Sequence, residues 1–364
     1  MNVMNIRLGT RRSALATTQA GMVADQLRAL GHAVEMVEIT TLGDTSTASL
    51  SSIGGTGVFA TAIRSALLTG EIDVAVHSLK DLPVAPEPGL RIAAIPVRED
   101  ARDALVARDG LTLGELPAGS VVGTGSPRRA AQLAALGLGL RVTDLRGNVD
   151  TRISLVRNGS LDAVLLARSG LARLGRLKEV TEILDPLQML PAPGQGALAV
   201  ECREDRPDLL EALAPLDDAD TRACVTAERA LLAALEAGCT APVGALAEVV
   251  DSEHGTELFL RAFAGTEDAS IDLRRSGVGS LKEPERVGRD LAAVLLADGA
   301  VEIAGLRSEK LLDGDGSPDQ PPEQPPHHPE ASPSEGQVAA ETAQSASSQP
   351  AVSYPDRSAS ESAS

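Results

Sequence analysis

Polar residues of several kinds crowd the end of one predicted strand. The mostly apolar residues 72–76 predict a buried strand, and His77, Ser78, Lys80 and Asp81 follow before Pro83 ends the segment. Open α/β sheets bind ligands at the carboxyl ends of their strands, so these side chains are candidates for chemistry. The alternative is a strand end that meets solvent, with Lys80 and Asp81 as surface charges. The segment alone does not decide between the two interpretations.

Two arginines stand at the start of a predicted helix. Ser126 is a candidate N-cap, and Pro127 suits the first helical position, which places Arg128 and Arg129 in the first turn. The helix dipole disfavours cations there. Free amide donors and two guanidinium groups instead favour an anion site. The alternative, a set of surface ion pairs with nearby carboxylates, would contribute little to stability. We favour the anion site.

Further arginines occupy similar positions at loop–helix junctions. Arg146 and Arg152 flank a glycine turn, and Arg11 and Arg12 lie at the matching position of an earlier strand–helix junction. Arginine suits planar carboxylates better than lysine does. The chain carries a formal net charge of −18 and yet gathers arginine at these junctions. This pattern predicts a ligand with several carboxylates or phosphates.

One of the three cysteines lies in a predicted loop. Cys239 follows Gly238 at a helix end and precedes Pro242, whereas Cys202 lies in an apolar strand and Cys224 on a helix. Exposure in a loop permits nucleophilic or covalent-carrier chemistry. A lone cysteine is, however, more often a small hydrophobic residue, and the residues alone favour that interpretation.

Composition excludes several classes of function. Three Phe, one Tyr and no Trp, together with the charge of −18, argue against a nucleic-acid partner. An odd number of cysteines without a CxxC pair predicts a reducing compartment, and we expect no membrane segment, no signal peptide and a cytoplasmic location. His32 and His254 accompany His77 without forming a metal set or a triad, so we expect no metal and a buried His77.

The order of predicted elements indicates an α/β fold. Strands at 5–10, 33–39 and from 72 alternate with helices at 13–30 and 58–68, a parallel α/β pattern. The loop at 40–57 is long enough to suspect a lid, and its Gly54-Gly55-Thr56-Gly57 lacks the ending of a P-loop. Strands grouped before a final helix at 283–296 indicate a small α+β domain.

A second passage repeats the first. Strands ending in Gly9-Thr10 and Gly123-Thr124 each lead through Ser and Arg into an Ala-rich helix, and the segment around Asp162 resembles that around Asp73. The repeat predicts two lobes that face each other across a cleft. We expect lobe 1 at 1–96 and 191–214, lobe 2 at 97–190 and a third domain at 215–308. Residues 309–364 form an acidic, Pro/Ser-rich tail, expected to be disordered.

Seven segments, taken in order, resemble the porphobilinogen deaminase family over nearly all of residues 5–305. They are Gly9-Thr10-Arg11-Arg12-Ser13-Ala14-Leu15-Ala16, Gly54-Gly55-Thr56-Gly57-Val58-Phe59, His77-Ser78-Leu79-Lys80-Asp81-Leu82-Pro83, Ser126-Pro127-Arg128-Arg129, Arg146-Gly147-Asn148-Val149-Asp150-Thr151-Arg152, Pro193-Gly194-Gln195-Gly196-Ala197 and Gly238-Cys239-Thr240-Ala241-Pro242-Val243-Gly244.

The resemblance implies two lobes of the type II periplasmic-binding-protein kind, a cleft between them and a small C-terminal α+β domain. It implies that Cys239 carries a dipyrromethane cofactor through a thioether and that Asp81 is the catalytic carboxylate. It further implies a set of residues that hold cofactor and substrate: Arg11, Ser13, Ser78, Lys80, Thr124, Ser126, Arg128, Arg129, Arg146, Gly147, Arg152 and Gln195.

The implied reaction joins four porphobilinogen molecules into hydroxymethylbilane with release of ammonia, in a monomer without nucleic-acid or membrane partners. Thr56 departs from the lysine that the family often has there, and no second Asp follows Asp44 closely. The competing interpretation is a non-catalytic polycarboxylate-binding module of the same two-lobed fold. A thiol-dependent acyl carrier would need a histidine beside Cys239, and the sequence does not offer one.

Overall fold

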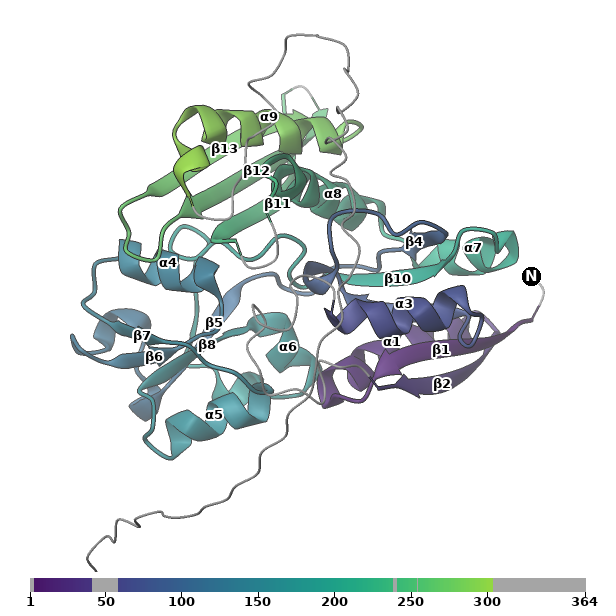
Figure 1. Cartoon of the computed structure of the whole chain (residues 1–364), viewed down its shortest axis with the longest axis horizontal. Coiled ribbons are helices and arrows are strands. Elements are labelled where there is room, and N and C mark those ends of the chain that lie inside the picture. The colour runs from purple at the N-terminus through teal and green to yellow at the C-terminus, as the bar shows by residue number, and fades with distance from the viewer. Residues whose placement is uncertain (1–2, 41–57, 238–240, 254, 304–364) are drawn as a thin grey trace, which may run out of the picture. The chain divides into compact units, whose positions relative to one another are not determined.

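The computed structural model describes residues 3–40, 58–237, 241–253 and 255–303 (Figure 1). The loop at 40–57 beyond Thr40, Cys239 and the tail from 309 onward therefore lie outside the described residues. No helix within the described ranges is long and apolar enough to cross a bilayer.

The first sheet, sheet A, has five strands in the order β2-β1-β3-β10-β4. Strand β1 runs parallel to β2 and β3, while β10 runs antiparallel to β3 and β4. The strands are β1 (Asn5–Arg11), β2 (Ala33–Ile39), β3 (Val74–Ser78), β4 (Leu90–Ala94) and β10 (Leu198–Arg203).

Helices cover both faces of sheet A. Val74 and Val76 of β3 pack in one cluster with α1 (Ala14–Ala29) and α7 (Pro207–Leu213), whereas Ala75 packs in another with α3 (Val58–Leu68). Alternate residues of a strand point to opposite faces, so a strand buried on both sides is apolar throughout. The strand β10, which comes from much later in the chain, pairs with β3 and β4 and completes sheet A.

The second sheet, sheet B, repeats the arrangement in the order β7-β6-β8-β5-β9. Helix α4 packs on one face and helices α5 and α6 on the other. Its strands and helices are β5 (Asp103–Ala107), β6 (Val121–Gly123), β7 (Arg141–Thr143), β8 (Ala163–Ala167), β9 (Glu182–Ile183), α4 (Pro127–Ala135), α5 (Val149–Arg157) and α6 (Arg168–Arg173).

The predicted repeat is present in the structure. In both sheets the first strand of the repeat lies between the second and the third, parallel to both. Asp73 accepts a hydrogen bond from the backbone N–H of Arg7 at 2.9 Å, and Asp162 accepts one from that of Val121 at 2.7 Å. Asp73 precedes β3 and bonds to β1, and Asp162 precedes β8 and bonds to β6. The two Asp residues thus link the third strand of each repeat to the first strand in the same way.

The predicted parallel pattern is confirmed for β1, β2 and β3, but the sheets are not parallel throughout. Each sheet contains an antiparallel strand that the chain adds out of sequence: β10 in sheet A, and β5, which pairs antiparallel with β8, in sheet B. Strand β5 follows the segment 95–102, and β10 follows the segment 191–197. In each of these segments the chain passes from one sheet to the other. The crossing segments are therefore built directly onto strands, and residues in them are held by both sheets.

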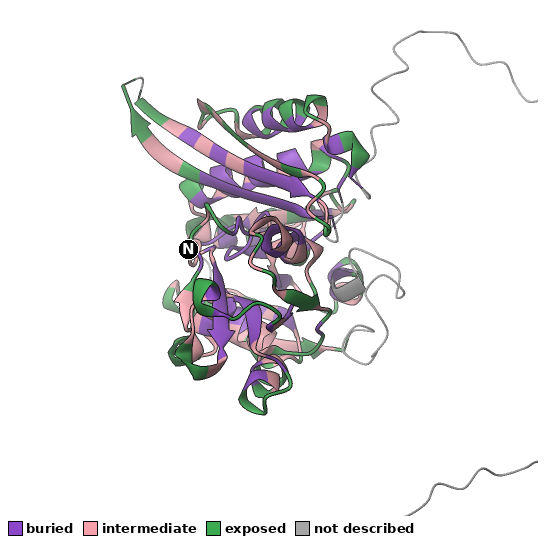
Figure 2. Cartoon of the chain, turned by 90° about the vertical axis from the view of Figure 1, so that its left-hand side faces the viewer, coloured by how far each residue is buried: buried purple, intermediate pink, exposed green. Residues whose placement is uncertain are grey.

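The third sheet, sheet C, has the antiparallel order β11-β12-β13, with α8 and α9 packed on it through one apolar cluster. Strands β11 and β12 are buried near Val243 and Gly265 and become exposed toward the turn that joins them (Figure 2). The elements are α8 (Ala219–Ala234), β11 (Val243–Ser252), β12 (Gly255–Gly265), β13 (Asp272–Ser280) and α9 (Pro284–Ala297). The two-lobed α/β fold with a small α+β domain is confirmed.

Candidate active site

The polar residues after β3 form a short turn. Leu79–Asp81 is one turn of 3-10 helix, in which Leu79 is buried and Asp81 is exposed. Leu79 donates its N–H to the carbonyl of Ala197 at 3.1 Å, and Leu82 donates to the carbonyl of Leu79 at 3.1 Å. Lys80 and Asp81 therefore project from a turn whose two ends, Leu79 and Leu82, are held by burial and by these hydrogen bonds.

Asp81 lies at a small pocket of lobe 1. Ser78 and Gln19 share a hydrogen bond there, with Gln19 Nε2 3.0 Å from Ser78 Oγ. Ser13 caps helix α1, its Oγ accepting from the N–H of Ala16 at 3.3 Å. The pocket is lined by Arg11, Ala16, Gln19, Ala60, Ile63, Val76, His77, Ser78, Asp81 and Leu82. The structure therefore brings Arg11 together with Ser78 and Asp81, which come from two separate motifs of the sequence.

His77 is buried, as the sequence predicted. Its Nε2 lies 3.3 Å from Oε2 of Glu201, and Arg64 donates to the same carboxylate at 2.9 Å. Burial by itself would raise the pKa of Glu201, but His77 and Arg64 outweigh it and hold that pKa below its usual range. This group joins β3 to β10 and to α3, directly before the turn in the chain.

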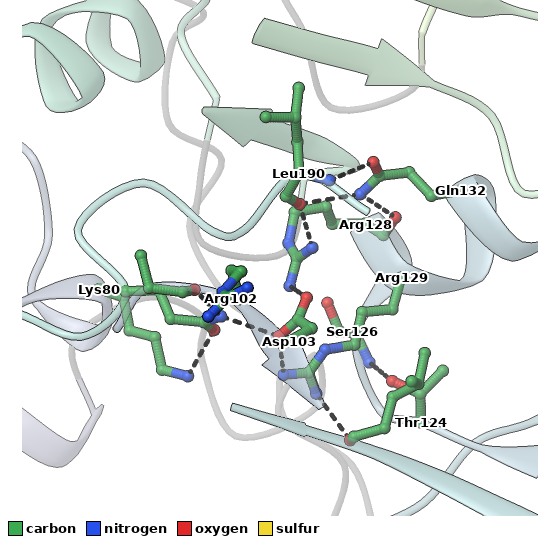
Figure 3. Close-up of polar contacts among 12 residues, drawn as sticks. Lys80, Arg102, Asp103, Thr124, Ser126, Arg128, Arg129, Gln132 and Leu190 are labelled. Atoms are coloured by element: carbon green, nitrogen blue, oxygen red, sulfur yellow. Dashed lines mark hydrogen bonds and ion pairs between the residues drawn. The ribbon is translucent and has the colours of Figure 1, made fainter. Parts of the chain in front are cut away.

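Arg128 and Arg129 converge on one buried carboxylate, Asp103 (Figure 3). Arg128 Nη2 lies 2.8 Å from Oδ2 of Asp103, and Arg129 Nη2 lies 2.7 Å from Oδ1. Each arginine also donates to a backbone carbonyl, that of Leu190 or Leu165. Burial would raise the pKa of Asp103, but the two guanidinium charges outweigh it and hold the pKa well below its usual range.

Gln195 extends this network to the first lobe. Its Nε2 donates to Oδ1 of Asp103 at 2.8 Å and to the carbonyl of Ala101 at 2.7 Å, while Lys80 Nζ donates to its Oε1 at 3.2 Å. Gly194 and Gly196 on either side have φ of +76° and +90°, a region that favours glycine. This glycine turn points the amide of Gln195 between Lys80 and Asp103.

The environment of Lys80 is unfavourable to its positive charge. Burial lowers its pKa to about 8, and the charges of Arg129 and Arg128 act in the same direction, against Asp81 and Asp103. Lys80, Arg128 and Arg129 are three cations, and the carboxylates that act on them among the described residues are Asp103 and Asp81. The excess positive charge would be relieved by an anionic ligand.

The Arg146-to-Arg152 turn contributes a further cation to the same electrostatic site. Gly147 has a φ of +108°, and a Cβ there would lie 2.9 Å from the Thr151 methyl group. Arg152 donates its Nε–H to the carbonyl of Gly147 at 2.8 Å. Burial lowers the pKa of Arg152, and the charges of Arg129 and Arg146 act in the same direction, against Asp144. Arg146 is exposed.

Thr124 and Ser126 shape the start of helix α4. Thr124 is buried, and its Oγ1 accepts a hydrogen bond from the N–H of Ser126 at 3.3 Å. Ser126 has the extended backbone of an N-cap, and Pro127 occupies the first helical turn, as predicted. The carbonyl of Ser126 accepts from the N–H of Arg129 at 3.0 Å, so this junction fixes where the two arginines begin.

Cys239, the predicted attachment point, lies outside the described residues, although its neighbours Ala237 and Ala241 are described and buried. Cys202 and Cys224 are free and buried. Burial raises the pKa of Cys202 to about 11 and that of Cys224 to about 12. Both are therefore poor nucleophiles at neutral pH.

Sequence reasoning missed Asp103, Gln19 and the pair Arg98–Glu228. Arg98 Nη1 lies 2.6 Å from Oε1 of the fully buried Glu228, which also accepts from the backbone N–H of Gly194 at 2.6 Å. Glu228 of α8 thus holds both crossing segments. In the sequence, Asp103 could have been noticed as a carboxylate at the first position of the apolar strand Asp103–Ala107. No pattern in the sequence indicated the pair Arg98–Glu228.

Comparison with known proteins gives a consistent result. A family model described as "Porphobilinogen deaminase, dipyromethane cofactor binding domain" matches residues 6–211, and one described as "Porphobilinogen deaminase, C-terminal domain" matches 222–297. A porphobilinogen deaminase of Mycobacteroides abscessus is 61% identical over 305 residues, which are 82% of this chain and 99% of that protein. One of Mycobacterium marinum is 61% identical over 303 residues, 82% of this chain and 96% of that protein.

Among solved structures, the methionine-binding protein MetQ aligns with a TM-score of 0.38 at 14% identity, covering 58% of this chain and 89% of that chain. The assignment rests on the family models and the curated relatives. The chain belongs to the porphobilinogen deaminase family.

Proposed function

We propose that this chain condenses four porphobilinogen molecules head to tail into hydroxymethylbilane, with release of ammonia, and that Asp81 is its catalytic carboxylate. As a family member the chain is a transferase of tetrapyrrole biosynthesis that works with a dipyrromethane cofactor. The roles of individual residues are our proposal. The observation that carries it is the network of Lys80, Gln195, Asp103, Arg128 and Arg129, which joins two lobes around an excess of positive charge.

The donor set fits a chain of pyrroles that bear carboxylates. Guanidinium groups bind planar carboxylates in a fixed geometry, and each charge-assisted hydrogen bond contributes about 1.5–3 kcal/mol. Lys80, Arg128, Arg129 and Arg152 would hold the carboxylates of cofactor and substrate, with Arg11 and Arg146 at more exposed positions. Asp103 sets the positions of Arg128 and Arg129, and Gln195 links their site to Lys80.

Asp81 is placed to stabilise positive charge on the substrate. It projects from a turn with fixed ends, at the pocket that Arg11 and Ser78 also line. When ammonia leaves the aminomethyl group, the pyrrole carries a developing positive charge. A carboxylate held in place accepts a hydrogen bond from the pyrrole N–H and stabilises that charge without reorganising. The same carboxylate can move a proton during carbon–carbon bond formation.

Cys239 is the proposed attachment point of the cofactor. The cofactor, when bound, supplies the free pyrrole carbon to which the first substrate is joined. Burial and a raised pKa make the Cys202 and Cys224 thiols poor candidates for a covalent bond. Cys239 is the remaining cysteine of the three.

We divide the chain into lobe 1 at 1–96 and 191–214, lobe 2 at 97–190, a third domain at 215–308 and a tail at 309–364. In support, the described strands of each sheet fall within one of these divisions. We further propose that the protein is a monomer and works in the cytoplasm; the free thiols of Cys202 and Cys224 support a reducing compartment.

The test is turnover by Asp81→Asn, assayed as porphobilinogen consumed and hydroxymethylbilane formed. We expect a loss of about 10²- to 10³-fold in kcat, the usual effect of removing one preorganised electrostatic group. Asp25→Asn is the matched control, because Asp25 is an exposed helix carboxylate paired with Arg28. Asp25→Asn should retain full activity. An Asp81→Asn enzyme as active as this control would contradict the assignment and leave the polycarboxylate-binding module.

A further inference from the structure

We propose that Arg229 is a positioning residue for the reaction: it clamps the turn that carries Lys80 and Asp81 to the third domain. Arg229 lies on α8, in the third domain. Its Nη2 donates to the carbonyl of Pro83 at 2.6 Å, and its Nη1 donates to the carbonyls of Leu82 at 3.1 Å and Leu79 at 3.4 Å. These three carbonyls bracket the two polar residues.

Arg229 contacts carbonyl groups at the end of the turn. The backbone of the turn supplies a hydrogen-bond donor to only one of them. A 3-10 turn leaves its last carbonyls without an internal partner, and a cation near that end is favourable. The carbonyl of Leu79 accepts the one bond that closes the turn, from Leu82. The planar guanidinium group reaches Leu82 and Pro83 with two nitrogens at once, which an ammonium group cannot do in the same geometry.

Apolar contacts hold the same turn on the same helix. Val225, one helical turn before Arg229, packs in one cluster with Leu79 and Leu82. Val84, just beyond the turn, packs against the apolar core of sheet C and its helices. The turn therefore rests on α8 through side chains and is fixed in orientation by the guanidinium group of Arg229.

The helix that holds the turn is the one that leads to Cys239. Helix α8 ends at Ala234, and Cys239 follows five positions later. Through Arg229, the exposed carboxylate of Asp81 is therefore fixed relative to the domain on which we place the cofactor. This inference rests on the proposed roles of Asp81 and Cys239. The guanidinium group of Arg229 donates to the backbone of the turn, so we expect it to act on the reaction through the position of that turn, which carries Lys80 and Asp81.

The test compares Arg229→Met with Arg222→Met. Arg222 lies on the same helix and donates to the carbonyl of Ala93 on β4 at 3.2 Å. It also pairs with Asp217 at 2.7 Å, and these contacts lie away from the turn. We expect Arg229→Met to lower kcat about 10- to 100-fold, the usual effect of a displacement of about 1 Å, while KM stays within about threefold. Arg222→Met should keep kcat within about twofold of the wild type.

Two further measurements separate positioning from general damage. Guanidinium ion at low millimolar concentration should restore part of the kcat of Arg229→Met and leave Arg222→Met unchanged. Arg229→Lys keeps the charge and should fall between wild type and Arg229→Met, which covers the case in which the Met variant does not fold. Equal kcat losses in the two Met variants, or a wild-type kcat in Arg229→Lys and Arg229→Met, would overturn the clamp. The proposed function is tested separately, because it predicts a loss of about 10²- to 10³-fold in kcat for Asp81→Asn whatever Arg229 does.

Discussion

Replacing Asp103 by asparagine tests whether the buried network is held by charge. The Asp103 side chain is fully buried and accepts three hydrogen bonds, from Arg128 at 2.8 Å, Arg129 at 2.7 Å and Gln195 at 2.8 Å. Asparagine has nearly the same shape but no charge, and its amide NH₂ would face donors. Two buried guanidinium groups would then lose their counter-charge, and removing one partner of a buried ion pair costs about 3–5 kcal/mol.

The assay is urea unfolding, with thermal unfolding alongside. A change of about 2–4 °C in Tm per kcal/mol applies to chains of this general size. Asp103→Asn should therefore lower Tm by roughly 6–20 °C. Asp109→Asn is the matched control, because Asp109 pairs with Arg108 at the surface with 70% of its side chain exposed. Its loss should cost at most about 1 kcal/mol.

The difference between wild type and Asp103→Asn should also depend on pH in a defined direction. The folded-state pKa of Asp103 is depressed, so its contribution is complete above the unfolded-state pKa and is lost as pH falls through the folded-state value. The stability difference should be constant between pH 5 and 8 and shrink below about pH 4. A loss of stability no larger than that of Asp109→Asn would refute the reasoning about buried charge.

Two other predictions concern residues in or next to the same buried network. Because the pKa of Lys80 is lowered to about 8, its charge is lost as pH rises through 8, and KM for porphobilinogen should rise there. Lys80→Arg keeps its charge and should flatten that rise. An equal rise of KM in both proteins would exclude Lys80 as its source. Gly196→Ala should cost at least about 1–3 kcal/mol in thermal or urea unfolding, because its φ is +90° and its Cβ would lie 2.3 Å from the carbonyl oxygen of Glu99. Gly114→Ala is the control, since no described heavy atom lies within 4 Å of a Cβ there, and its stability should hardly change; equal stability of the two variants would contradict the backbone argument.

Local signals in the sequence predicted the elements well. Helix α1 begins after Ser13, which caps it, and ends before Gly31, whose φ is +94°. The resemblance between the segments around Asp73 and Asp162 predicted the two lobes, because each Asp makes the same bond to the start of a first strand. These features depend on a few adjacent residues, so they can be read from spacing and residue type.

Contacts between distant residues could not be predicted in this way. Asp103 lies 25 residues from Arg128 and 92 from Gln195, and Arg229 lies 147 residues from Leu82. Helical or strand periodicity carries no information about such pairs. The sequence indicated that Arg128 and Arg129 form an anion site. It did not indicate that a carboxylate of the protein itself occupies one side of both guanidinium groups and orients them.

The antiparallel strands β5 and β10 were hidden for a related reason. Strand–helix alternation predicts parallel pairing, but each of these strands enters a sheet after the chain crosses from the other one. Their direction follows from that crossing, which is a property of the whole fold. The residues at the two crossings, Arg98 and Gln195, consequently have their partners in other parts of the chain.

The most direct test of the central claim is the intact mass of the purified enzyme before and after incubation with porphobilinogen, followed by peptide mapping. We predict a mass excess of two pyrrole units on the peptide that contains Cys239, reactive with Ehrlich's reagent, and unmodified peptides for Cys202 and Cys224. Cys239→Ser should lack the excess and turnover, while Cys202→Ser and Cys224→Ser should keep both. A Cys239 peptide that stays unmodified after incubation would contradict the account.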